Sequence, residues 1–114
     1  MERLVRGDII VIDFPFSNLV QFKPRPVLII KIPKGDDMVV NQITGSSYEK
    51  SVEIKIENKD FSKGSLKKDS YLRLDKIFSI EKSLVKSLVK YKIGSLKPEK
   101  FNEIIDKIVS FLKG

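Results

Sequence analysis

The stretch GDIIVIDFPFSNLVQFKPRPVLII, residues 7–30, contains two apolar runs separated by a polar and aromatic segment. Runs that are apolar at every position predict strands buried on both faces, as in a covered or closed sheet. A proline fixes its own φ and restricts the preceding residue to extended conformations, so Pro24 and Pro26 confine Arg25 at the entrance of the second strand. A merely solvated arginine needs no such restraint. Arg25 is therefore a candidate functional residue, and a structural salt bridge with an aspartate near the first run is the alternative.

The rest of the chain predicts further short strands and one clear helix. Apolar side chains recur at helical spacing from Pro98 to about residue 112, and 81–85 is typical of a brief helical turn. The expected fold is mainly β with α (α+β): a small SH3-like, strongly bent antiparallel sheet or partial barrel of five to seven strands with a C-terminal helix. The predicted strands are 9–14, 27–32, 38–43, 52–57, 70–75, 77–80 and 88–93, with turns or loops at 15–24, 33–36, 44–47 and 63–64.

Length and hydropathy favour a single cytoplasmic domain. A chain of 114 residues has ordinary single-domain size, and neither a linker nor a repeat divides it, so one domain over residues 1–114 is expected. The N-terminus has no uncharged stretch long enough for a signal peptide before Asp8 and Asp13. No segment reaches the ~18 apolar residues of a membrane-spanning helix. We therefore expect a cytoplasmic protein with no membrane partner.

The sequence contains neither cysteine nor histidine. This excludes zinc sites built from Cys and His, and it excludes Ser-His-Asp and Cys-His nucleophilic arrangements. An enzyme with this composition must use Arg, Lys, Asp, Glu, Ser, Thr or Tyr side chains.

The charge of the chain favours a polyanionic partner. Its 22 Lys and Arg against 15 Asp and Glu give +7, and six of those seven charges fall in residues 45–114. Only four of the basic residues are arginines: Arg3, Arg6, Arg25 and Arg73. Arginine offers a planar, multi-donor group suited to phosphate, so its sparing use marks Arg25 and Arg73 for attention.

Two further clusters are candidates for chemistry. Arg73 and Asp75 are two residues apart in a predicted strand, so their side chains share one face. A surface ion pair without further role is the alternative. Thr44 begins a loop of small polar residues, for which a turn that hydrogen-bonds its own backbone is the alternative. For Arg25, the aspartates of the alternative salt bridge are Asp8 and Asp13.

Blocks along nearly the whole chain resemble the MazF/PemK family, the toxins of type II toxin–antitoxin pairs. The opening RGDIIVIDFPF, residues 6–16, followed after a loop by RPVLII, residues 25–30, is the most specific match. Further matching blocks are QIT at 42–44, GSLKKDS at 64–70, LRLDKI at 72–77, FSIEK at 78–82 and IGSL at 93–96, followed by the amphipathic helix.

The resemblance implies a homodimer of CcdB/PemK-like fold that cleaves single-stranded RNA at short sequences without a metal or other cofactor. Such an mRNA interferase leaves a 2′,3′-cyclic phosphate and a 5′-hydroxyl, and an acidic, partly disordered cognate antitoxin neutralises it. The family's essential arginine and threonine fall on Arg25 and Thr44, while Arg73 and Asp75 match an arginine and an aspartate that some members use. The candidate RNA-binding residues, in the flanking loops, are Ser17, Asn18, Gln21, Lys23, Ser46 and Ser47.

Two departures from the family pattern leave the cut site open. The loop before Arg25 carries Leu19, Val20 and Phe22, more apolar than the Gly- and Ser-rich loop common in relatives, and Gly45 stands where many relatives have serine. The alternative function is a non-enzymatic binding protein on the same fold, either a DNA gyrase poison or a family member without activity. The joint presence of the four candidate catalytic residues favours the enzyme.

Overall fold

The computed structural model describes residues 3–15 and 22–114. Seven antiparallel strands form one sheet in the order β4-β6-β3-β2-β1-β7-β5, which confirms the predicted fold class. The strands are β1 (Asp8–Pro15), β2 (Phe22–Lys31), β3 (Asp37–Thr44), β4 (Glu53–Ile56), β5 (Phe61–Gly64), β6 (Ser70–Glu81) and β7 (Val89–Leu96). The helices are α1 (Lys82–Leu88) and α2 (Pro98–Lys113), with 3-10 turns at Lys50–Val52 and Asn58–Asp60.

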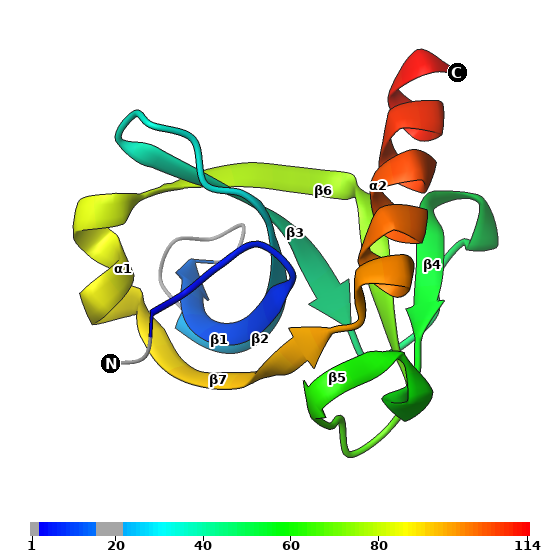
Figure 1. The fold of residues 1–114 in the computed structure, drawn as a ribbon, viewed down its shortest axis with the longest axis horizontal. Coiled ribbons are helices and arrows are strands. Elements are labelled where there is room, and N and C mark those ends of the chain that lie inside the picture. The colour runs from blue at the N-terminus through cyan, green and yellow to red at the C-terminus, as the bar shows by residue number, and fades with distance from the viewer. Residues whose placement is uncertain (1–2, 16–21) are drawn as a thin grey trace.

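Each face of the sheet carries its own hydrophobic cluster, and each cluster has its own helix. Figure 1 shows α1 and α2 on opposite sides of the curled sheet. The first cluster includes Ile9 and Leu28 together with the buried residues of α2, and the second includes Ile10 and Val27 with Val85 of α1 packed against it. Adjacent residues of β1 therefore belong to different cores, because successive strand side chains point to opposite faces. This explains why the first run is apolar at every position.

The second strand begins earlier than expected. The sequence predicted a loop to Pro24, but β2 starts at Phe22 and pairs with β1 from Pro15–Phe22 to Ile9–Leu28. Arg25 thus lies inside a strand, directly opposite Ile12. The pairs between β2 and β3 run from Val27–Gln42 to Lys31–Val39, so the two prolines precede that ladder. Proline is tolerated where a strand has a neighbour on one side only.

The strand β6 is continuous where two strands were predicted. Its register against β3 shifts between the pairs Asn41–Ile77 and Ile43–Leu72, so residues 73–76 face the single residue Gln42. Such a bulge bends a strand and redirects its side chains. The break expected near residue 76 corresponds to this bulge rather than to a chain reversal.

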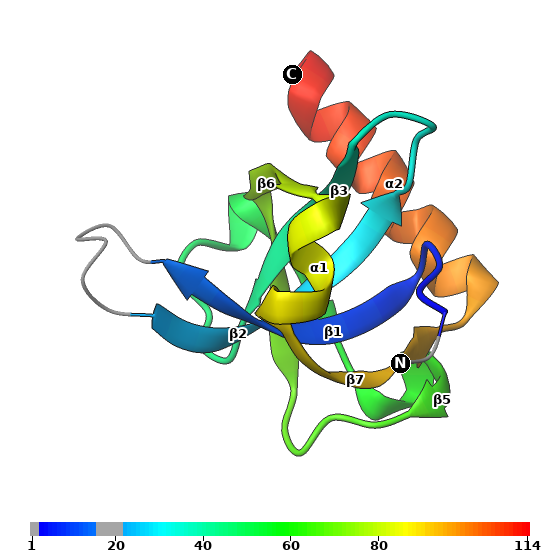
Figure 2. The same ribbon diagram turned by 90° about the vertical axis from the view of Figure 1, so that its left-hand side faces the viewer.

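The C-terminal half differs from expectation at two other places. The predicted turn at 63–64 is instead the end of β5, which the sequence analysis missed because it is short and largely polar. Gly64 and Gly94 are paired across β5 and β7, and a Cβ on Gly94 would lie 2.2 Å from the Lys63 carbonyl oxygen. Only glycine permits this approach. Strand β7 lies beside β1 as well, so β1 sits between β2 and β7, as Figure 2 shows from a second side.

No helix in residues 3–15 and 22–114 combines the length and the apolar character needed to cross a lipid bilayer.

Candidate active site

The bulge in β6 carries an ion pair with well-defined geometry. The Arg73 guanidinium donates from Nε to Asp75 Oδ1 at 2.9 Å and from Nη2 to Asp75 Oδ2 at 2.8 Å. These hydrogen bonds hold the pKa of Asp75 below its usual value and raise that of Arg73, so both groups are charged at neutral pH. The Arg73 side chain is only 14% exposed. A half-sheltered bidentate pair is a more ordered arrangement than a solvated surface pair.

A buried amide fixes the backbone of the bulge. Asn41 of β3 is completely buried, and its Nδ2 donates to the Arg73 carbonyl oxygen at 2.9 Å. Arg73 lies where the β3–β6 register shifts, so this side-chain contact joins it to β3 at a point where the ladder between the two strands is interrupted. Asn41 therefore holds in place the strand segment from which Arg73 and Asp75 project.

The loop after β3 folds onto the same strand. Thr44, which is buried, pairs with Tyr71 of β6, and its Oγ1 accepts a hydrogen bond from Ser46 N at 3.4 Å. This is the local turn that the sequence offered as the alternative reading of Thr44. A hydroxyl that accepts one hydrogen bond still has its own O–H as a donor. The Thr44 hydroxyl can therefore form this turn and also donate a hydrogen bond to a ligand.

Glu53 of β4 anchors the end of this loop beside Arg73. Its carboxylate accepts hydrogen bonds from the Ser47 hydroxyl and, at 3.1 Å, from Tyr48 N. The hydrogen bond from Ser47 lowers the pKa of Glu53. Glu53 and Arg73 are register partners, and the Arg73 guanidinium lies 5.0 Å from the centre of the Tyr48 ring. The predicted RNA-binding residue Ser47 is thus engaged with the protein itself.

Gly45 leaves room for a lysine ammonium next to Thr44. A Cβ on Gly45 would lie 2.9 Å from Lys68 Cε and 3.0 Å from Lys68 Nζ. Many relatives have a serine at this position. With glycine, the positively charged end of Lys68, from the segment before β6, can approach the loop. The sequence shows the glycine, but only the fold brings Lys68 next to it.

Arg25 lies at the same end of the β2–β3 ladder as Thr44. Val27 pairs with Gln42. Arg25 lies two residues before Val27, and Thr44 lies two residues after Gln42. Residues two apart in a strand share a face, so the backbone directs both side chains to the side of the second core cluster. Strand pairing thus places Arg25 and Thr44 on the same face of the sheet. Arg73 is joined to Asp75 and Tyr48 by direct contacts.

The aspartates considered as partners of Arg25 contact lysines of β7. Asp8 Oδ2 is 3.3 Å from Lys92 Nζ, and Asp13 Oδ2 is 3.6 Å from Lys90 Nζ. Among the other predicted RNA-binding residues, Ser46 and Lys23 are exposed. Ser17, Asn18 and Gln21 lie outside the described residues.

Four residues of this region were not found from the sequence: Asn41, Tyr48, Glu53 and Lys68. Their roles depend on pairing between strands that are distant in sequence, which local periodicity does not report. One signal was available for Tyr48, because an aromatic residue inside an otherwise polar loop is unusual.

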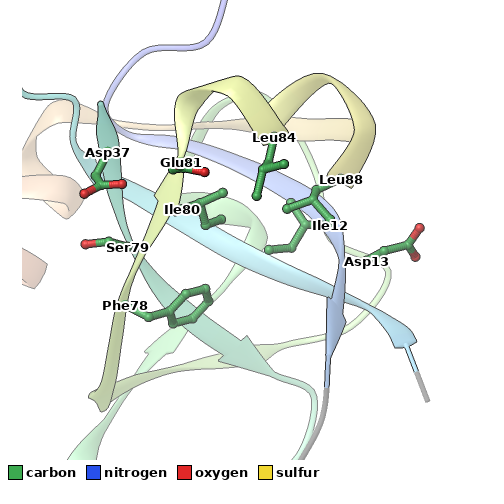
Figure 3. A pocket seen from close by; sticks show the side chains of 9 residues that line it. All are labelled: Ile12, Asp13, Asp37, Phe78, Ser79, Ile80, Glu81, Leu84 and Leu88. Atoms are coloured by element: carbon green, nitrogen blue, oxygen red, sulfur yellow. The ribbon is translucent and has the colours of Figure 1, made fainter. Parts of the chain in front are cut away.

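An apolar groove of about 390 Å³ lies on the face covered by α1. Figure 3 shows Ile80, Leu84, Leu88 and Ile12 directed toward one another. Three carboxylates, those of Asp13, Asp37 and Glu81, also line the groove, whose full lining is completed by Phe78 and Ser79. Leu84 is 47% exposed, and Ile12 is the register partner of Arg25. The groove is therefore continuous with the strand that carries the candidate arginine.

Within residues 3–15 and 22–114, no three acidic side chains gather in an arrangement that could hold a metal ion.

Comparison with known proteins shows the family and the fold of this chain. Residues 5–112 match the family described as PemK-like, MazF-like toxin of type II toxin–antitoxin system. No curated protein matches the chain in sequence. Several solved structures share its fold, including two mycobacterial proteins. An endoribonuclease in complex with its cognate antitoxin from a mycobacterial species has a TM-score of 0.71 and 18% identity over 97% of this chain and 96% of that one. The Mycobacterium tuberculosis toxin MazF-mt6 has a TM-score of 0.68 and 20% identity over 93% and 96%.

The family match covers almost the entire chain, and the four residues singled out from the family pattern lie on the strands and loop described above. The chain therefore belongs to the PemK-like, MazF-like toxins of type II toxin–antitoxin systems, a family known for endoribonucleases.

Proposed function

We propose that this chain is a sequence-selective, metal-independent endoribonuclease that cleaves single-stranded RNA as the toxin of a type II toxin–antitoxin system. The observation that carries the proposal is the bidentate Arg73–Asp75 pair beside the Thr44 loop, in a chain of this family that also places Arg25 at the same end of the sheet. A cytoplasmic protein with one toxin domain over residues 1–114 is part of this proposal.

The reaction requires charge stabilisation around one phosphate. The RNA 2′-oxygen attacks the phosphorus, the bond from phosphorus to the 5′-oxygen breaks, and a 2′,3′-cyclic phosphate and a 5′-hydroxyl result. The guanidinium of Arg25 offers parallel donors, so its role is to stabilise the non-bridging oxygens as negative charge develops. The Thr44 hydroxyl donates to one of these oxygens.

The proton balance falls to Asp75 and Arg73. Asp75 takes the proton of the 2′-hydroxyl, and the 5′-oxygen regains one from Arg73 or from water. A carboxylate can accept about four hydrogen bonds, so the two from Arg73 leave lone pairs for a substrate hydroxyl. The lowered pKa of Asp75 makes it a weak base. A weak base requires that the charge developing on the phosphate be stabilised, which is the role proposed for Arg25.

The Arg25→Lys variant tests this mechanism in single-turnover cleavage of a mixed-sequence single-stranded RNA. Lysine keeps the charge but cannot present two parallel donors, and loss of one preorganised donor commonly lowers rates about 10²–10³-fold. Arg6→Lys is the matched control, because Arg6 stacks on Phe101 of α2, in contact with the opposite core cluster. Circular dichroism verifies folding, and sequencing of the RNA ends reports selectivity. Equal cleavage by Arg25→Lys and wild type would show that Arg25 serves structure rather than catalysis. Absence of cleavage by the folded wild type would favour a non-enzymatic binding protein.

Chelation tests the metal-independence separately. Wild-type cleavage is expected to survive excess EDTA. If EDTA abolishes cleavage and Mg²⁺ restores it, the carboxylate of Asp75 acts as a metal ligand and its assignment as proton acceptor is wrong.

We also propose that the chain acts as a homodimer whose interface includes the groove beside α1. The groove joins exposed apolar surface at Leu84 to an acidic rim, and Lys90 lies at that rim beside Asp13. A patch with apolar centre and charges of both signs can pair with itself about a two-fold axis. Because Ile12 is the register partner of Arg25, this association would bring the candidate sites of two copies toward one groove.

The remaining partner is the cognate antitoxin. A net charge of +7 favours an acidic, partly disordered segment that folds on binding across the RNA site. Calorimetric titration with such an acidic peptide should show affinity that falls as salt concentration rises. Affinity that does not change with salt would contradict the charge argument.

A further inference from the structure

Tyr48 is the most exposed large hydrophobic or aromatic side chain in the described part of the chain. It is 75% exposed, although its ring lies in the loop that begins at Thr44. Because the ring is exposed, hydrophobic burial does not fix its position, and another contact must do so. That contact is Arg73, whose guanidinium lies 5.0 Å from the ring centre.

The contact with Arg73 occupies one face of the ring. The guanidinium also donates two hydrogen bonds to Asp75, so it is held from the side while the ring covers it. The high exposure of Tyr48 leaves its other face to solvent. The ring is thus a flat surface backed by a cation.

The backbone of Tyr48 is fixed as well. Tyr48 N donates to Glu53 Oε2 at 3.1 Å, and the preceding residue, Ser47, donates its hydroxyl to the same carboxylate. Glu53 stands opposite Arg73 in the β4–β6 ladder. Since Arg73 of β6 holds the ring and Glu53 of β4 holds the backbone, a ligand that stacks on Tyr48 orders little that is not already ordered.

We propose that Tyr48 is a stacking platform for an unpaired nucleobase of the RNA next to the cleaved phosphate. Exposed aromatic rings beside cationic groups bind single strands this way, because every base has a π-face and the phosphates favour positive charge. Uncharged side chains or acidic peptides do not fit as well, since the cation behind the ring favours an electron-rich planar partner beside a polyanion. This inference rests on the proposed function and extends it to a specific subsite.

A fluorescence experiment tests the stacking without cleavage. The chain has no tryptophan, so Tyr48→Trp introduces a single reporter. Saturation with a non-cleavable 2′-O-methyl RNA should quench this reporter, while Tyr91→Trp, at a similarly exposed tyrosine of β7, should change little. Unchanged Tyr48→Trp emission when fluorescence anisotropy shows the RNA bound would overturn the proposal. If no RNA binds and the wild-type protein cleaves none, the proposed function fails first, and the subsite with it.

Kinetics separate stacking from a purely structural role. Loss of one stacked base weakens binding roughly 5- to 150-fold, so Tyr48→Ala should raise KM by that factor with a nearly unchanged kcat. Tyr48→Phe should retain the wild-type KM. If Tyr48 only held Arg73 in place, Tyr48→Ala would instead lower kcat at constant KM, and that result would overturn the proposal.

A series of abasic RNAs locates the base. Replacing one nucleotide at a time by an abasic residue should identify a single position at which wild-type affinity falls. At that position the affinity of Tyr48→Ala should be the same with and without the base. In a double-mutant cycle, removing the ring and removing the base eliminate the same interaction. Equal sensitivity of wild type and Tyr48→Ala at every position would contradict the pairing.

Discussion

The side chain of Asn41 donates a hydrogen bond to the main-chain oxygen of Arg73, 32 residues further along the chain. The candidate catalytic pair therefore depends on a buried residue that has no access to substrate. Asn41 Oδ1 is buried and accepts no hydrogen bond within the described residues, so the amide is retained for its donor rather than for a balanced network.

Substitution of Asn41 should affect cleavage more than the fold. Asn41→Leu removes the hydrogen bond to the Arg73 carbonyl, and loss of one such bond typically costs ~0.5–1.5 kcal/mol of unfolding free energy. Urea unfolding measures this cost, and single-turnover cleavage should fall further because the bulge loosens. Wild-type cleavage by folded Asn41→Leu would show that the hydrogen bond does not position the pair.

Cleavage by the Asn41→Asp variant should depend on pH. A buried carboxyl group has a raised pKa, and only its protonated form can donate to the Arg73 carbonyl. Its cleavage relative to wild type should recover as pH falls from about 8 to about 5, whereas the deficit of Asn41→Leu should stay constant. A constant deficit in both variants would point to lost packing instead.

The Arg73–Asp75 pair should stabilise the fold at all but strongly acidic pH. The folded pKa of Asp75 lies below its ordinary value of 3.8, so its contribution is complete above that value and disappears as pH falls through the folded pKa. Asp75→Asn should lower the unfolding free energy by less than about 1 kcal/mol near neutral pH, because the group is partly exposed. Thermal unfolding of both proteins should converge at the acidic end. A difference that grows toward low pH would contradict this assignment.

Gly45→Ser should act through Lys68. The new Cβ would meet the end of the flexible lysine, which can move away at little cost to the fold. RNA affinity should decrease, and the slope of its logarithm against the logarithm of salt concentration should fall by about one. Adding Lys68→Ala to Gly45→Ser should cause no further loss, while Lys107→Ala on α2 is the control for simple removal of a charge. Additive losses would mean that serine acts by another route.

Leu84→Glu should break the proposed dimer. A glutamate in the groove adds a charge to a rim that already carries three carboxylates, so self-association becomes unfavourable. Light scattering should give about twice 13.1 kDa for wild type and the single mass for the variant. Leu112→Glu, at an exposed leucine near the end of α2, should remain dimeric. A dimer of Leu84→Glu would place the interface elsewhere.

The sequence was informative wherever one strand or helix explains its own pattern. The unbroken apolar run of β1 predicted burial on both faces, the apolar stripe of α2 predicted its packing on the sheet, and the spacing of Arg73 and Asp75 predicted that their side chains share a face. The division of the interior into two clusters is visible only in the structure. Asn41 looked like an ordinary polar residue inside an apolar strand, since its partner is the backbone of β6. The approach of Lys68 to Gly45 and the anchoring of Tyr48 by Glu53 likewise arise only when distant segments meet, which is why these residues were missed.

The position of β1 between β2 and β7 has a consequence for folding. Asp8 accepts its hydrogen bond from Ser95 across a separation of 87 residues, so β1 completes its pairing only after β7 has been synthesised. Contacts between such distant residues slow folding, because the intervening chain loses conformational entropy before they form. The edge of β1 that β7 later covers is open to other extended chains until then, so misassembly is most favoured before β7 docks.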